Sequence, residues 1–65
     1  MFVWTYLDGS DLEVGRSPGF PEAAQAEDWL GSTWQELFER GVEAVVLHDD
    51  RGRKLYRMSL GAEPA

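Results

Sequence analysis

The sequence predicts a small α+β domain, in which one amphipathic helix packs on a four-stranded, mainly antiparallel sheet in the order β-β-α-β-β. Three observations predict it: segments rich in β-branched and aromatic residues near both ends, one central segment with helical apolar spacing, and turn residues between them. The 65 residues are enough for one domain. We expect residues 1–60 to form that domain and residues 61–65 to form a flexible C-terminal tail.

The N-terminal part of the chain predicts a hairpin. Its first strand, residues 2–7, alternates two sets of side chains with strand-like composition. These are Phe2, Trp4 and Tyr6 on one face and Val3, Thr5 and Leu7 on the other. After a turn, the second strand, residues 12–17, is expected to place Leu12 and Val14 inward. Its Gly15 predicts a bulge or a close approach by another backbone.

A long amphipathic helix is predicted for residues 21–40. Pro21 suits the first helical position, and Gly41 is the expected C-terminal stop. Gly31 lowers helix propensity by ~1 kcal/mol relative to Ala, which permits a bend or a short break, but we predict one continuous helix. One stripe of the helix is apolar and is expected to face the sheet. It consists of Ala23, Ala26, Leu30, Trp34 and Leu37, with Phe38 at its margin.

Two further strands are predicted after the helix. Residues 42–48 are apolar on both sides, as in a central strand, and residues 53–60 carry charges that suit an edge strand by discouraging unwanted pairing. If the first and third strands are central neighbours, the spatial order of the strands is 2-1-3-4. The helix is then a right-handed crossover between parallel strands.

The predicted sheet has more apolar surface than one helix can cover. One apolar face is left over, and soluble monomers rarely expose such a patch. We therefore predict a non-enzymatic interaction module that forms a homodimer or docks on a larger protein. The residues assigned to the partner surface are Phe2, Trp4, Tyr6 and Trp29, the last of which lies off the apolar stripe of the helix. Two alternatives stay open: residues 17–21 cover the leftover face, and Trp29 covers an edge of the sheet.

Charge is distributed unevenly along the chain. Twelve acidic and six basic residues give a net charge of -6, which repels nucleic acid on average. Four of the basic residues nevertheless cluster around an aromatic one, in a pattern that binds single-stranded nucleic acid by phosphate contact and stacking. The residues of this alternative are Arg51, Arg53, Lys54, Tyr56 and Arg57. An edge strand protected by charge is favoured, because nucleic-acid binders are usually basic; pairing with an acidic protein surface is a third interpretation.

No catalytic or metal-binding pattern stands out. His48 is the single His and precedes two Asp residues, but consecutive strand residues point to opposite faces, and residues 49–52 have the composition of a turn. A second acidic cluster, formed by Asp8, Asp11 and Glu13, is also typical of a solvated turn. The sequence lacks a nucleophile elbow and a phosphate-binding loop. We therefore predict no enzymatic activity, no cofactor and no metal.

Composition also bears on the compartment. The sequence contains no Cys, which argues against a disulfide-stapled secreted module. Residues 1–7 have no basic region and no small-residue cleavage site, and Asp8 interrupts their apolar run far short of a membrane span. A cytoplasmic protein without membrane association is predicted.

Five segments spread over nearly the whole chain carry a resemblance. They are residues 4–9 (WTYLDG), 15–17 (GRS), 26–30 (AEDWL), 41–45 (GVEAV) and 55–60 (LYRMSL). Taken together, they resemble a family of short proteins of actinobacterial genomes with a β-β-α-β-β pattern. The resemblance implies a cytoplasmic bacterial origin and a free-standing chain, and it carries over neither an activity nor a functional residue.

Overall fold

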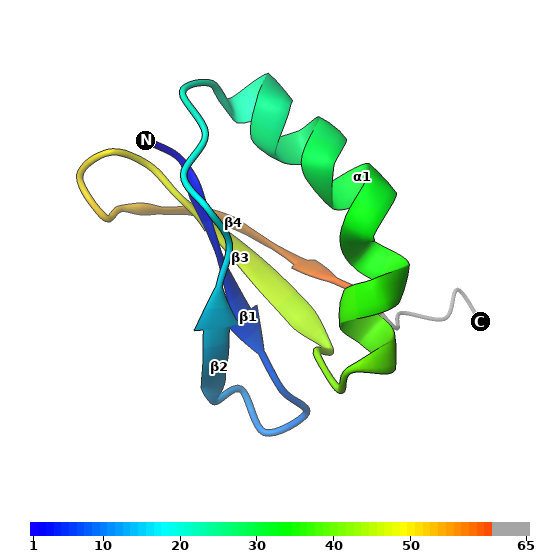
Figure 1. The fold of residues 1–65 in the computed structure, drawn as a ribbon. Helices are drawn as coiled ribbons and strands as arrows, with labels where there is room; N and C mark the ends of the chain where they lie inside the picture. The colour runs from blue at the N-terminus through cyan, green and yellow to red at the C-terminus, as the bar shows by residue number, and fades with distance from the viewer. Residues whose placement is uncertain (61–65) are drawn as a thin grey trace.

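The sheet and its single helix form two layers, as Figure 1 shows. The computed structural model describes residues 1–60, and the predicted tail at residues 61–65 lies outside them. The elements are β1 (Val3–Leu7), β2 (Glu13–Arg16), α1 (Ala23–Glu39), β3 (Ala44–His48) and β4 (Lys54–Ser59). The predicted fold class and element order are therefore confirmed.

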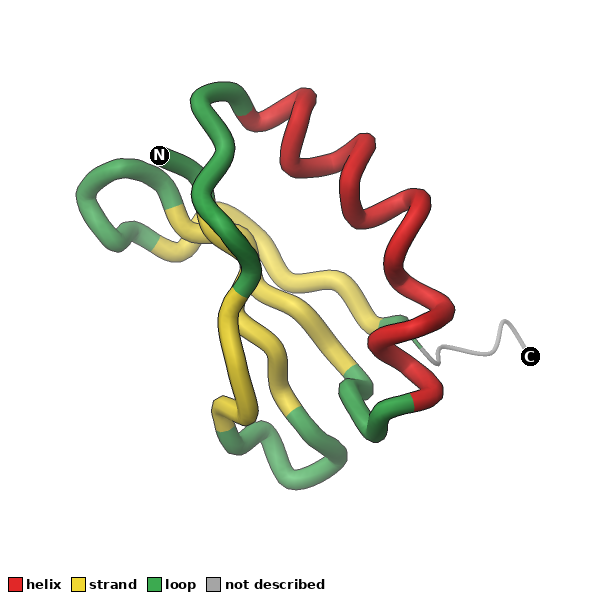
Figure 2. The backbone as a smooth tube through the Cα atoms, in the orientation of Figure 1, coloured by secondary structure: helices red, strands yellow, loops and turns green. Residues whose placement is uncertain are grey.

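The strand order in the sheet is β2-β1-β3-β4, the order expected if the first and third strands are central neighbours, and every neighbouring pair is antiparallel. Because β2 and β3 both run antiparallel to β1, they are parallel to each other. The helix links these two strands and crosses over one face of the sheet, which Figure 2 shows as a red helix beside yellow strands. β2 and β4 are consequently the two edge strands.

The core lies between α1 and the sheet face that carries Phe2, Trp4 and Tyr6. Trp4 is fully buried, and its indole Nε1 donates a hydrogen bond of 2.8 Å to the carbonyl oxygen of Ala26 on α1. The small side chain of Ala26 lets the helix approach the indole closely. The buried core cluster consists of Trp4, Ala26, Leu30, Leu37, Val42, Val45 and Leu47, and Phe2 and Tyr6 pack against it. The prediction that Phe2, Trp4 and Tyr6 form an uncovered partner surface is wrong, because the helix covers that face.

The helix is continuous through Gly31, as predicted, and begins at Ala23, slightly later than the sequence indicated. It ends where Gly41 adopts a left-handed φ of 98°. The Val42 N–H then donates to the Leu37 carbonyl over 3.1 Å, and the Gly41 N–H donates to the Phe38 carbonyl over 3.1 Å. These two bonds form a Schellman motif, which satisfies the last carbonyls of the helix.

Four apolar side chains expected inside are exposed. Phe38 is 43% exposed, and Trp34 is 41% exposed, since it stands over the end of β4, where no further strand of residues 1–60 lies beneath it. Leu12 and Val14 are also exposed, at 64% and 55%. The pairing of β2 with β1 has a register shift between Gly15 and Glu13, which makes Val14 an extra residue; a bulge here was one of the two predictions for Gly15. That bulge changes which side chains of β2 face the core.

Replacing Trp4 with Phe should lower the free energy of unfolding by about 2 to 4 kcal/mol, because it leaves a cavity and removes the hydrogen bond to α1. Urea-induced unfolding followed by circular dichroism measures the loss. The matched control is Trp34→Phe, at a half-exposed position of α1, which should cost less than about 1 kcal/mol. Equal losses for the two variants would contradict the central position of Trp4.

Candidate functional site

The sheet face opposite α1 carries polar contacts between its own strands. Although no helix covers it, Val46 is only 5% exposed. The Arg57 guanidinium of β4 reaches the Asp11 carboxylate in the β1–β2 turn over 2.9 Å, and this ion pair lies on the same face. Thr5 Oγ1 and His48 Nδ1 form a further polar contact of 3.0 Å there. These two contacts link side chains of β1, β3, β4 and the β1–β2 turn across the leftover face of the sheet.

Residues 17–21 and Trp29 pack on the helix side of the sheet. Phe20 pairs with Phe2 through two backbone hydrogen bonds of 2.7 and 2.8 Å. The Phe20 ring contacts the Trp29 ring, with 5.5 Å between the ring centroids. The half-buried Trp29 therefore closes the edge of the core beside this loop, which agrees with the alternative assigned to it and not with a free interface anchor. The loop itself does not cover the opposite face.

Two aspartates form the turns, as the sequence indicated. The Asp49 carboxylate accepts hydrogen bonds from the N–H groups of Arg51 and Arg53, each 2.9 Å long, and these bonds lower the pKa of Asp49. Asp8 accepts from two N–H groups of the first turn in the same way. The carboxylates of Asp8 and Asp49 thus each accept hydrogen bonds from backbone N–H groups of the turn that contains them. Within residues 1–60, no three His, Cys, Asp or Glu side chains converge as a metal site would require.

A polar hollow of about 480 Å³ lies beside His48, on the face opposite α1. Its wall includes Glu13 and Arg16, whose side chains form an ion pair of 2.7 Å. The Arg16 guanidinium lowers the pKa of Glu13 by this hydrogen bond. These two charged side chains are therefore exposed and paired with each other at the wall of the hollow.

In the folded chain, the basic stretch at residues 51–57, which is the alternative nucleic-acid-binding surface, is spread over a turn and two faces of the sheet. Arg51 and Arg53 lie in the turn before β4, which begins at the exposed Lys54. Arg57 is paired with a carboxylate on the face opposite α1, whereas Tyr56 lies on the helix side of the sheet. These five residues therefore do not form one continuous basic surface.

Tyr56 is also tied to the helix. Its hydroxyl donates a hydrogen bond of 2.6 Å to the Glu27 carboxylate, and its ring meets the edge of Trp4 with 5.9 Å between centroids. Burial, and then the hydrogen bond and charge of Glu27, raise the pKa of Tyr56 to about 12. A carboxylate beside the ring would repel a phosphate backbone, so the surroundings of Tyr56 disfavour nucleic acid.

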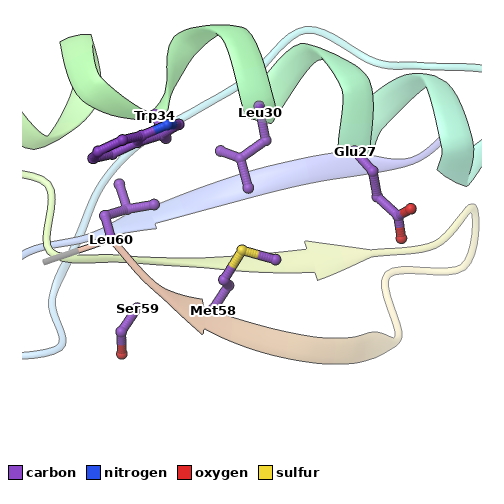
Figure 3. Close-up of a pocket in the computed structure, with 7 residues that line it drawn as sticks. Glu27, Leu30, Trp34, Met58, Ser59 and Leu60 are labelled. Atoms are coloured by element: carbon purple, nitrogen blue, oxygen red, sulfur yellow. The ribbon is translucent and has the colours of Figure 1, made fainter. Parts of the chain in front are cut away.

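An apolar groove of about 330 Å³ runs between α1 and β4. Figure 3 shows Leu30 and Trp34 descending from the helix, Met58 and Leu60 rising from the strand, and Ser59 pointing away. The groove is lined by Glu27, Leu30, Gly31, Trp34, Met58, Ser59 and Leu60. Gly31 leaves the space open, because a Cβ built there would meet no atom within 4 Å.

The outer edge of β4 borders this groove. The Leu60 N–H donates to the Glu43 carbonyl of the preceding segment over 2.9 Å, so Leu60 bonds toward β3. Because successive residues of a strand direct their backbone groups to alternate sides, Met58 and Tyr56 also bond toward β3, while Arg57 and Ser59 direct their N–H and C=O groups outward. Among residues 1–60, no strand pairs with this edge.

Sequence analysis missed the groove because it assigned Trp34 to the core stripe. A signal for it was present in the helix. Glu27, Gly31, Trp34 and Phe38 follow one another at intervals of four, three and four residues, so they form a second stripe beside the buried one. A Gly between large side chains on such a stripe, next to an edge strand with apolar residues on one face, indicates an open groove.

No family model matches the chain, and the comparisons with curated proteins and with solved structures gave no match. The resemblance to short actinobacterial proteins stays a prediction. Residues 1–60 contain no helix with the length and apolar character needed to cross a membrane.

The Tyr56 hydroxyl should make stability depend on pH in the alkaline range. Its ordinary pKa of 10.0 is raised to about 12 in the folded protein, so folding holds this proton more tightly than the unfolded chain does. The stabilisation is complete below pH 10 and is lost as the pH rises to 12.

Replacing Tyr56 with Phe should reduce the loss of stability at alkaline pH. Near neutral pH, the missing hydrogen bond should lower the free energy of unfolding by about 0.5 to 1.5 kcal/mol. Urea unfolding at a series of pH values tests both effects. Tyr6, whose pKa burial also raises, remains in both proteins and provides the background slope. Identical alkaline slopes for the two proteins would contradict the Tyr56 contact.

Proposed function

We propose that this chain is a non-enzymatic protein–protein interaction module, and that its contact surface is the groove between α1 and β4 together with the free edge of β4. The observation that carries the proposal is the apolar lining of that groove. Trp34 and Met58, one from each wall, are both 41% exposed. Protein interfaces are enriched in such Trp and Met side chains.

The row of apolar side chains continues beyond the groove. Phe38 lies one turn after Trp34 on α1 and is 43% exposed. Covering these side chains would remove apolar area from water at about 25 cal/mol per Å². Aromatic anchors of this kind supply most of the binding energy in typical interfaces. A partner over the groove would therefore gain more from Trp34 and Phe38 than from the charged surface around them.

The edge of β4 adds a second source of affinity. Arg57 and Ser59 direct backbone donors and acceptors outward, and an extended partner segment can pair with such groups by adding a strand to the sheet. The side chains of that segment would then alternate between the groove and the opposite face. Both contributions come from adjacent parts of one surface.

The cytoplasm is the compartment that we assign to this function. A chain without Cys is compatible with a reducing environment. The net charge of -6 favours solubility.

Filling the groove should abolish partner binding without unfolding the protein. In Gly31→Leu the new side chain enters open space, and helix propensity rises by about 0.8 kcal/mol. Tagged wild type and Gly31→Leu are used to capture proteins from an extract of the native cells, and captured proteins are quantified by mass spectrometry. Partners enriched by the wild type should fall at least tenfold with Gly31→Leu.

Two charge variants locate the surface. Met58→Glu, at the wall of the groove, should also lose the partners, whereas Val14→Glu, at an exposed apolar position on the opposite edge strand, should keep them. Thermal unfolding of each variant verifies that it is folded. Retention of the same partners by Gly31→Leu and Met58→Glu would refute the assignment of function to the groove.

A further inference from the structure

We propose that the partner of the α1–β4 groove is a second copy of this chain, joined edge to edge through antiparallel β4 strands about a two-fold axis at Met58. This inference rests on the proposed function and names its partner. The residue pattern of β4 is self-complementary about this axis.

An axis at Met58 matches the backbone of β4 to itself. It sets Arg57 opposite Ser59 of the second copy, and these are the residues whose N–H and C=O groups face the free edge. Each such pair can exchange two hydrogen bonds, and the two Met58 residues then face each other without bonding through their own backbone groups. The directions of the edge groups follow from the bond between the Leu60 N–H and the Glu43 carbonyl.

The same axis matches the side chains. Tyr56 stands opposite Leu60 of the second copy and Met58 opposite Met58, so each helix-side pair is apolar. On the other face, Arg57 stands opposite Ser59. Cross-strand pairs of this kind stabilise a sheet, whereas like charges directly opposite destabilise it.

Two registers with an axis nearer the start of β4 fit less well. An axis at Arg57 would place two guanidinium groups face to face. An axis at Tyr56 would set Lys54 against Met58, at the register shift where β4 pairs with β3. The charges of Arg57 and Lys54, which suit β4 to an edge position, thus exclude these two registers. They do not exclude pairing over residues 56–60, where Arg57 is the one charged residue and is already paired with Asp11.

The symmetry also brings the two grooves together. An axis perpendicular to the sheet keeps both α1 helices on the same face. Because the groove borders β4, the second copy would then close its open side. Trp34, Met58 and Leu60 of both copies would contribute to one apolar cluster.

The net charge of the chain gives dimer formation a salt dependence that differs from that of binding an acidic partner. Each copy carries a net charge of -6, so two copies repel each other at long range and screening favours their association. The dimer dissociation constant should fall by a factor of about three or more between low and high salt. Binding of an acidic partner to the basic end of β4 would weaken under the same change.

Disulfide trapping tests the register. The chain has no Cys, so Met58→Cys introduces a single thiol. Facing residues of this type lie ~4.5 Å apart between Cα atoms, which is within the range of a disulfide. The matched control is Leu55→Cys on the same strand, since Leu55 and Met58 are 44% and 41% exposed. In the proposed register the two Leu55 residues are offset by six residues, or ~20 Å.

Under mild oxidation, Met58→Cys should form a covalent dimer at least tenfold faster than Leu55→Cys. Analytical ultracentrifugation of the unmodified wild type at low and high salt accompanies this test, and it should show a dimer that strengthens with salt. Comparable trapping rates for the two variants would overturn the register.

A wild type that is still monomeric at about 1 mM in high salt would overturn the dimer itself. Such a result is distinguishable from failure of the proposed function. In that case Gly31→Leu and Met58→Glu would still lose other captured proteins, which would then be the occupants of the groove.

Discussion

The Trp4 side chain fixes the position of the helix on the sheet. Its indole N–H donates to the Ala26 carbonyl on α1 over 2.8 Å, while its backbone N–H donates to Ser17 Oγ over 2.9 Å. Its ring also meets Tyr56 of β4 at 5.9 Å. One buried residue therefore connects β1 with the segment after β2, the helix and β4. In a chain of 65 residues, which has a small core, such a contact carries a large share of the stability.

This attachment explains why one side of the sheet stays open. The buried side chains of α1 pack on the central strands, so the helix residues next to them project over β4, at the edge of the sheet. Gly31 leaves a space on that flank, and Trp34 and Met58 border it. On the opposite flank, the rings of Phe20 and Trp29 pack against each other beside the core. The open groove is thus a consequence of how the helix is anchored.

The sequence predicted the element order and the Gly41 helix stop, because these follow from local periodicity and turn chemistry, whereas it predicted the strand order only on the condition that the first and third strands are central neighbours. It did not determine which face the helix covers, since Phe2, Trp4 and Tyr6 alternate with a second apolar set. The helix covers the face that carries Trp4, and the hydrogen bond between Trp4 and Ala26 on that side joins residues far apart in the chain. The exposure of Trp34 was missed for a related reason: helical spacing does not show where the sheet beneath ends.

Residue-resolved hydrogen exchange tests the central claim, that the outer edge of β4 pairs with the same edge of a second copy, most directly. Tyr56 and Met58 bond toward β3, so their amides should be protected at every protein concentration. The amides of Arg57 and Ser59 face outward and should exchange fast in dilute solution, then become protected as the concentration rises and the edge is paired. Equally fast exchange of Arg57 and Ser59 over the whole concentration range would contradict the account.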